Sequence, residues 1–150
     1  MTMIDVSEKK EVLREATALG IIRLRPETVK LLQEGKIVKG DPLCVAKIAG
    51  VLAAKKTSEL IPLCHLLPLT SVKVCPKVLN ETTIEVLAIV KACAQTGVEM
   101  EALSAVSIAL LTIWDMTKQY EKDANGQYPT TSIQNVQVIQ KYKQEVERDE

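Results

Sequence analysis

The chain has 150 residues, 47% of them hydrophobic and 25% charged, which is the mix of one globular domain with a single core and excludes a disordered chain. Its 19 basic and 19 acidic residues balance, so it lacks the positive excess typical of a general polyanion binder. Aromatic residues make up only 3%, which disfavours single-stranded nucleic acid as a partner, because such binding uses aromatic stacking, whereas an anionic small molecule needs only a few local lysines.

The chain begins with a predicted strand and a short helix. Residues 1–10 are polar, lack the apolar core of a signal peptide and are expected to be flexible. Partial alternation of β-branched and small residues predicts a strand at 13–25. Pro26 fits the first turn of a short helix at 27–33, and Gly35 fits its end.

A longer helix is predicted next. Asp41 is a suitable N-cap and Pro42 a suitable first helical residue, and the helix is expected to continue to about residue 59. A rigid apolar loop bounded by prolines follows at 62–68. Apolar residues recur along the helix at spacings of three and four and make one stripe: Val45, Ile48, Ala49, Leu52 and Ala53.

The second half of the chain predicts a hairpin, a long helix and a last strand. Alternating apolar residues predict strands at 71–79 and 82–93, and Pro76 indicates an irregularity or a sheet edge. The helix expected at 98–122 has glutamates in its first turn and lysines near its end, which suits the helix dipole. The last strand is predicted at 130–141.

This order of elements predicts an α+β fold: a ferredoxin-like split βαβ arrangement, with an antiparallel sheet and helices packed on one face. Residues 1–150 are expected to form one domain, with a charged, flexible tail at 144–150. The longest apolar run, at 102–114, is shorter than the roughly 20 residues of a bilayer span and is interpreted as a buried helix.

The cysteines and the single histidine give no metal-binding pattern. Cys44, Cys64, Cys75 and Cys93 include no CxxC pair, so a zinc site is not expected. Without an export signal the chain is expected to be cytoplasmic, with free thiols that fill the core.

Taken one at a time, the polar candidates have ordinary structural explanations. His65 fits a partly buried histidine bonded to backbone, and residues 39–41 fit a turn with a helix cap. The glutamates of the last helix fit surface acids at its N-terminus. Asp115 and Lys118 fit an exposed ion pair on one helix face. The combination is more informative than any single residue.

Several segments, in the same order along residues 3–141, resemble motifs of the MoaC family. Leu66 stands where the family usually has proline, while the other matches are close. The segments are Met3-Ile-Asp-Val-Ser7, Lys39-Gly-Asp41, Ile48-Ala-Gly50 with Ala53-Ala-Lys-Lys-Thr57, Ile61-Pro-Leu-Cys-His65, Thr96-Gly-Val-Glu-Met-Glu-Ala-Leu103 and Trp114-Asp-Met-Thr-Lys118.

The resemblance implies roles for individual residues. Asp115 and Lys118 fall on the pair regarded as catalytic in the family. Lys141 falls on a lysine that opens a glycine-rich C-terminal segment, but residues 141–144 contain no glycine, so Lys141 or Lys143 could take that role. The positions implied to bind substrate are Lys39, Leu63, Cys64, His65, Glu99, Met100, Glu101 and Lys141.

The resemblance also implies a reaction. MoaC proteins act in molybdenum cofactor biosynthesis as lyases that convert 3′,8-cyclo-7,8-dihydro-GTP to cyclic pyranopterin monophosphate and release pyrophosphate. Such chemistry needs cations for the phosphates, a proton donor and acceptor for ring nitrogens, and exclusion of water. A lysine beside other cations can work near neutral pH through a lowered pKa. No tightly bound cofactor is expected, although Mg²⁺ could enter with the substrate phosphates.

One expectation about assembly follows from spacing alone. Glu101 and Asp115 are 14 residues apart in one predicted helix, or about 21 Å at 1.5 Å per residue. They cannot face the same small substrate from one chain, so a homo-oligomer with sites at dimer interfaces is expected. The resemblance implies a homohexamer, built as a trimer of dimers.

Two other functions fit the same fold, because a ferredoxin-like sheet proves no activity. One is a ligand-binding module, which needs cations for phosphate but not Asp115 beside Lys118. The other is an assembly protein, which needs neither His65 nor Lys39. Neither nucleic acid nor a membrane is an expected partner.

Overall fold

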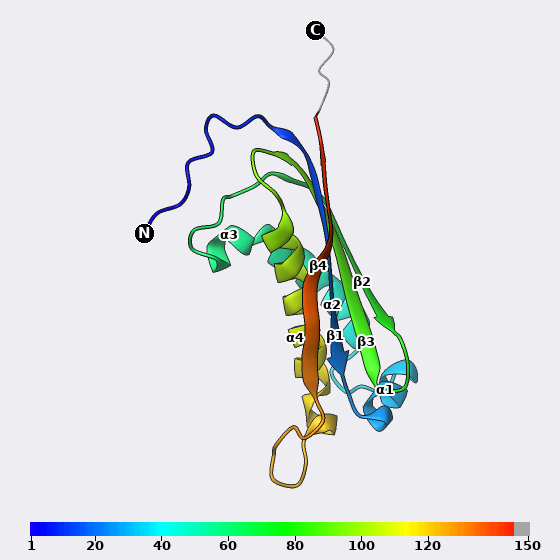
Figure 1. Cartoon of the computed structure of the whole chain (residues 1–150). Coiled ribbons are helices and arrows are strands. Elements are labelled where there is room, and N and C mark those ends of the chain that lie inside the picture. The colour runs from blue at the N-terminus through cyan, green and yellow to red at the C-terminus, as the bar shows by residue number, and fades with distance from the viewer. Residues whose placement is uncertain (146–150) are drawn as a thin grey trace.

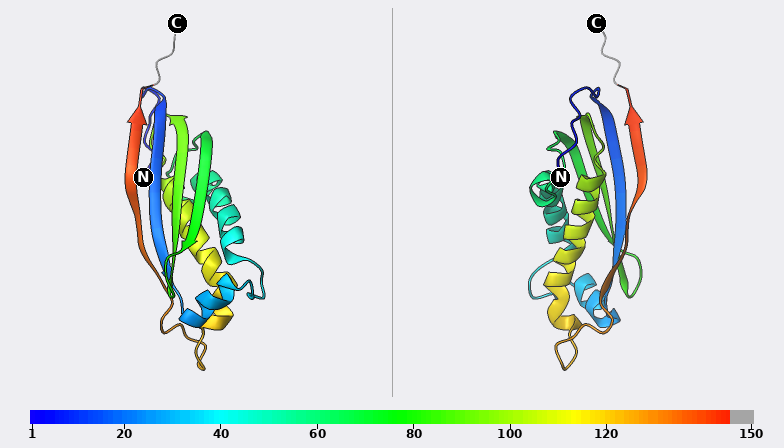
Figure 2. Two further views of the ribbon diagram at one scale, coloured as in Figure 1. Left: turned by 90° about the vertical axis from the view of Figure 1, so that its right-hand side faces the viewer. Right: turned by 60° about the vertical axis from the view of Figure 1, so that its left-hand side comes forward.

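The computed structural model describes residues 1–145 and shows a four-stranded antiparallel sheet (Figure 1). The strands lie in the order β2-β3-β1-β4, and Figure 2 shows the helices on one face of the sheet. The predicted ferredoxin-like α+β fold is confirmed. The elements are β1 (Val12–Arg23), α1 (Pro26–Gln33), α2 (Pro42–Lys55), α3 (Thr57–Leu60), β2 (Leu69–Val78), β3 (Thr83–Ala94), α4 (Glu99–Glu121) and β4 (Ser132–Gln144).

The core lies between the sheet and the two long helices, α2 and α4. Every second residue of β3 is buried, because successive side chains of a strand point to opposite faces. α4 contacts β1 and β3 and packs along α2. By length and composition α4 could span a membrane. Half of its most apolar stretch is buried inside the fold, however, as in a core helix. Its fully buried residues include Ala102, Ala105, Val106, Ala109 and Leu110.

The apolar stripe predicted on α2 is only in part its buried face. Val45, Ile48 and Leu52 are 40%, 59% and 51% exposed. The buried face is made of small residues instead, because the backbones of α2 and α4 approach closely. A Cβ at Gly50 would lie only 3.0 Å from the backbone oxygen of Ala105 in α4. Close packing of the two helices therefore selects the small face and leaves the larger apolar residues outside. The buried residues of α2 are Pro42, Ala46, Gly50, Ala53 and Ala54.

The helix predicted to reach residue 59 is interrupted. α2 ends at Lys55, and Lys56 has φ −105° and ψ 8°, after which α3 forms a separate turn. All other element ends lie within three residues of the predicted ones. Pro76 lies in β2, which is an edge strand, as the proline indicated.

The prediction that the cysteines fill the core is wrong. All four are free, but Cys44 is exposed and the other three are only partly buried. Cys75 and Cys93 neighbour the buried Val74 and Ala92 in their strands and therefore point to the opposite, open face of the sheet.

Candidate active site

Two lysines and one aspartate meet near the C-terminal end of α4. Lys39 Nζ lies 2.8 Å from Asp115 Oδ2 and 3.0 Å from the Asp115 backbone oxygen. Lys118 Nζ lies 2.9 Å from Asp115 Oδ1 and comes from the same helix, three residues later. We call Lys39, Asp115 and Lys118 the lysine–aspartate cluster. Its exposed ion pair between Asp115 and Lys118 was expected, whereas the second lysine comes from a distant segment.

The turn between α1 and α2 delivers Lys39 to the cluster. Gly40 has φ 111°, a backbone conformation that favours glycine. The Asp41 side chain accepts hydrogen bonds from the backbone N–H groups of Leu43 and Cys44 and so caps α2. The Lys39-Gly-Asp41 motif is thus a turn and a helix cap that also places a lysine over Asp115.

Charges within the cluster fix its protonation. The hydrogen bond from Lys39, followed by that from Lys118, lowers the pKa of Asp115 to about 2, so this residue is a carboxylate at neutral pH. The hydrogen bond and charge of Asp115 in turn raise the pKa of Lys118. A lowered lysine pKa is therefore not found at Lys118, because the carboxylate lies directly against its ammonium group.

An aromatic wall borders the cluster. A cavity of about 350 Å³ is lined by Leu111, Trp114, Asp115, Lys118 and Tyr128. The Trp114 and Tyr128 rings pack edge to face with their centroids 5.3 Å apart. The cavity therefore has an apolar side beside a charged one.

A larger cavity, of about 680 Å³, lies at the opposite end of α4, and we call it the His65 cavity. His65 Nε2 lies 2.6 Å from the backbone oxygen of Ile4, and since a carbonyl only accepts, Nε2 carries the proton. Burial raises the pKa of the Cys64 thiol, and the charge of Glu101 adds to this effect. The expected residues that line the cavity are Leu63, Cys64, His65, Glu99, Met100 and Lys141.

Glu99 of α4 and Lys141 of β4 form an ion pair at the edge of this cavity. Desolvation favours a higher pKa for Glu99, but the hydrogen bond from Lys141 and the charges of Lys141 and Arg14 outweigh it, so the net shift is downward. Lys141 lines the cavity and Lys143 does not, so the geometry favours Lys141 as the C-terminal lysine of the site.

Glu101 is buried, not a surface acid. It is 3% exposed, and its Oε2 atom finds no hydrogen-bond partner among residues 1–145. Burial raises its pKa, and the nearby charge of Glu99 adds to the shift. Glu101 follows Met100, which lines the His65 cavity, but is not itself among the lining residues. A buried carboxylate oxygen without a partner is costly, and a buried acid with a perturbed pKa is a candidate acid–base group.

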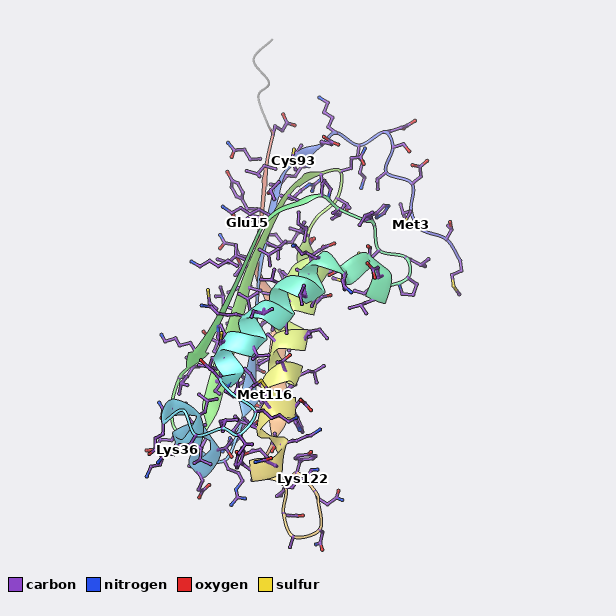
Figure 3. All side chains as sticks on the ribbon, turned by 180° about the vertical axis from the view of Figure 1, so that it is seen from behind. Met3, Glu15, Lys36, Cys93, Met116 and Lys122 are labelled. Atoms are coloured by element: carbon purple, nitrogen blue, oxygen red, sulfur yellow. The ribbon has the colours of Figure 1, made fainter. Side chains whose placement is uncertain are left out.

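The cluster and the His65 cavity are separated by the length of α4. The helix is unbroken from Glu99 to Glu121, which leaves about 21 Å between Glu101 and Asp115. In Figure 3, Met3, whose neighbours line the His65 cavity, lies far from Lys36, which precedes the turn that carries Lys39. One copy of the chain therefore does not bring both groups to one small substrate.

Sequence reasoning missed several residues around the His65 cavity. The segment at 1–10, expected to be flexible, contributes Ile4 and Lys9 to the lining. Arg14 donates to the backbone oxygens of Ala94 and Gln95 and adds positive charge near Glu99. No motif marked Lys9, and Arg14 looked like any residue of an amphipathic strand.

The chain is similar to known proteins over almost its whole length. Residues 3–144 match the MoaC family. A probable cyclic pyranopterin monophosphate synthase of Saccharolobus solfataricus is 56% identical over 142 residues, which cover 95% of either chain. The protein of the same name from Pyrococcus furiosus is 54% identical over 143 residues, covering 95% of this chain and 91% of the relative. The chain therefore belongs to the MoaC family.

Proposed function

We propose that the chain is a cyclic pyranopterin monophosphate synthase, a phosphorus–oxygen lyase that converts 3′,8-cyclo-7,8-dihydro-GTP to cyclic pyranopterin monophosphate and pyrophosphate. The observation that carries the proposal is the lysine–aspartate cluster, in which one carboxylate holds two ammonium groups 2.8 and 2.9 Å away. The names of relatives at 56% and 54% identity support the same reaction.

The cluster suits the phosphate end of the substrate. Lys39 and Lys118 present two cations whose positions Asp115 fixes, and preorganised charge of this kind stabilises a departing pyrophosphate. With a raised pKa, Lys118 is protonated in the free protein, so we assign it the role of proton donor or electrostatic partner. Asp115 orients the two lysines as a carboxylate.

The His65 cavity suits the base and its rearrangement. Glu101, with its raised pKa and unpaired oxygen, is the proposed acid–base group for ring nitrogens. Glu99 and Glu101 can accept hydrogen bonds from the guanidine-like edge of the base. Lys141 adds a cation, and His65, whose Nε2 donates to the Ile4 carbonyl, offers Nδ1 as an acceptor.

The complete site is proposed to combine two copies of the chain, with the cluster of one copy facing the His65 cavity of the other. The separation along α4 supports this arrangement. Exposed apolar residues on the helical layer, such as Ile48, Leu52 and Leu111, offer surface for such contacts. We propose a homohexamer built as a trimer of dimers, working in the cytoplasm without a tightly bound cofactor, with any Mg²⁺ carried by the substrate phosphates.

Turnover is the direct test. The purified chain is incubated with 3′,8-cyclo-7,8-dihydro-GTP, and pyrophosphate is measured together with pterin fluorescence after oxidation. We expect product at substoichiometric protein, lost in Asp115→Ala and Lys118→Ala. Lys36→Ala is the matched control, since Lys36 lies three residues before Lys39 but pairs with Glu34 on the surface and not with Asp115.

Other outcomes separate the alternatives. Tight binding of the substrate without pyrophosphate release would indicate a ligand-binding module. Absence of both binding and turnover would leave an assembly protein. Full activity of Lys118→Ala would show that the assigned centre is wrong.

A further inference from the structure

Tyr120 belongs to neither group of site residues, yet it touches the segment that carries Lys39. Its hydroxyl oxygen accepts a hydrogen bond of 3.0 Å from the backbone N–H of Val38, the residue directly before Lys39. The ring packs against the hydrophobic core, so the hydroxyl is held at a fixed place near the end of α4.

The Val38 side chain makes little contact with the rest of the fold. It is 80% exposed, so packing does not fix its position. The neighbouring Ile37 is buried, and its carbonyl accepts from the N–H of Gly40 to close the turn. Among residues 1–145, the hydrogen bonds that join this turn to α4 are therefore the one to Tyr120 and those of the Lys39 side chain.

The end of α4 that carries Tyr120 is itself firmly anchored. The Tyr120 backbone oxygen accepts from Arg25 Nη1 at 3.5 Å. The next residue, Glu121, is fully buried and accepts hydrogen bonds from the backbone N–H of Arg25 and from the hydroxyls of Thr28 and Thr131. These bonds join α4 to α1 and to the start of β4, so the Tyr120 hydroxyl sits on a rigid support.

We propose that Tyr120 is a positioning residue, whose hydroxyl fixes the Val38–Lys39 turn so that the Lys39 ammonium group meets the Asp115 carboxylate. The proposal rests on the proposed function in one respect, namely that Lys39 acts on the substrate. Tyr120 does not touch the substrate and acts through Lys39 alone.

Tyr120→Phe tests the proposal, because it keeps the ring and removes only the hydroxyl. We expect hydrogen exchange at the Val38 amide to become roughly 3–10-fold faster, the range expected for one lost hydrogen bond. The turnover number kcat should fall by a similar factor, with a smaller change in KM and no loss of folding cooperativity. Tyr142→Phe is the matched control, since its exposed hydroxyl bonds to Gln144 at 3.0 Å, far along β4.

A second readout needs no turnover. The hydrogen bond from Lys39 is the main reason for the low pKa of Asp115, so in Tyr120→Phe the Asp115 carboxyl carbon should titrate at higher pH by NMR. An unchanged Val38 exchange rate, or an unchanged Asp115 titration, would overturn the proposal. Changed exchange and titration with an unchanged kcat would overturn it as well. Both changes in a chain that shows no turnover would support the positioning and refute the proposed function.

Discussion

Glu101 and Asp115 lie on one unbroken helix, with about 21 Å of α4 between them. Glu101 is buried directly after Met100, which lines the His65 cavity, and Asp115 holds two lysines at the other end. α4 thus works as a rigid spacer. In a two-fold dimer with the two α4 helices antiparallel, the Asp115 end of each copy would meet the Glu101 end of the other, and two equivalent composite sites would form.

Mixing two inactive variants tests this arrangement. Glu101→Ala and Asp115→Ala should each abolish turnover, yet a hybrid carries one site with both residues intact. If the two variants pair at random, half of the dimers are hybrids, and each hybrid has one intact site out of two. We therefore expect about a quarter of the activity of the unmodified protein. The measurement is pyrophosphate release by the co-expressed variants, purified together through one tag that both carry. A hybrid as inactive as its parents would show that each site lies within one copy.

The buried carboxylate of Glu101 should lower stability as pH rises. Its folded-state pKa lies above the ordinary value of 4.5, so the folded chain holds its proton more tightly than the unfolded chain. Stability is therefore lost as pH rises from about 4.5 through the folded pKa, because the unfolded state binds fewer protons. Glu101→Gln removes this penalty, which we place at about 1–3 kcal/mol for a buried group without a partner.

Melting curves of Glu101→Gln across pH provide the measurement. The variant should melt higher at pH 7, by about 2–4 °C for each kcal/mol gained. The difference should vanish below pH 4.5, where Glu101 is protonated in both states. Turnover should fall in the same variant, since the gain comes from removing a proposed acid–base group. Equal melting temperatures at pH 7 would mean that the carboxylate is satisfied in the assembled protein.

Gly50→Ala should weaken the contact between α2 and α4. Helix propensity alone predicts a gain from this change of about 0.5–1 kcal/mol. The added Cβ, however, would lie 3.0 Å from the Ala105 oxygen and from both methyl groups of Val74, and overpacking of this kind costs about 1–3 kcal/mol. We expect a net loss of stability in thermal or urea unfolding. A higher melting temperature would show that α2 can shift outward without cost.

The sequence was sufficient for the order of elements, because strand alternation, proline positions and helix caps are local signals. It was not sufficient for the buried face of α2. Both faces of that helix are apolar, and hydrophobicity alone favoured Ile48 and Leu52 over Ala46 and Gly50. The outcome depends on how closely the backbone of α4 approaches, and that distance is a property of the tertiary structure.

For the site residues too, some features could be predicted from the sequence and others depend on the tertiary structure. Motif resemblance marked Asp115, Lys118 and Lys39, but only the fold shows that Lys39 crosses to Asp115 from 76 residues away. The spacing of Glu101 and Asp115 in the sequence predicted that these two residues lie too far apart to reach one substrate. The unbroken α4 confirms that separation. The contact between Tyr120 and Val38 could not be predicted from the sequence, because every residue except proline has the same backbone N–H group.

Gly97→Ala should impair function with little effect on stability. Gly97 has an ordinary backbone conformation, but a Cβ there would overlap Glu99 Oε2. The carboxylate is the far end of a flexible side chain, so it can move away cheaply. By moving, Glu99 would lose its present geometry with Lys141 at the edge of the His65 cavity. We expect a melting temperature within about 2 °C of the unmodified protein, together with a raised KM.

Gly126→Ala is the contrasting control, because Gly126 has φ 73° and open space around it. That change should lower stability and leave KM unchanged. A Gly97→Ala protein with normal KM would show that the Glu99–Lys141 pair does not contribute to substrate binding.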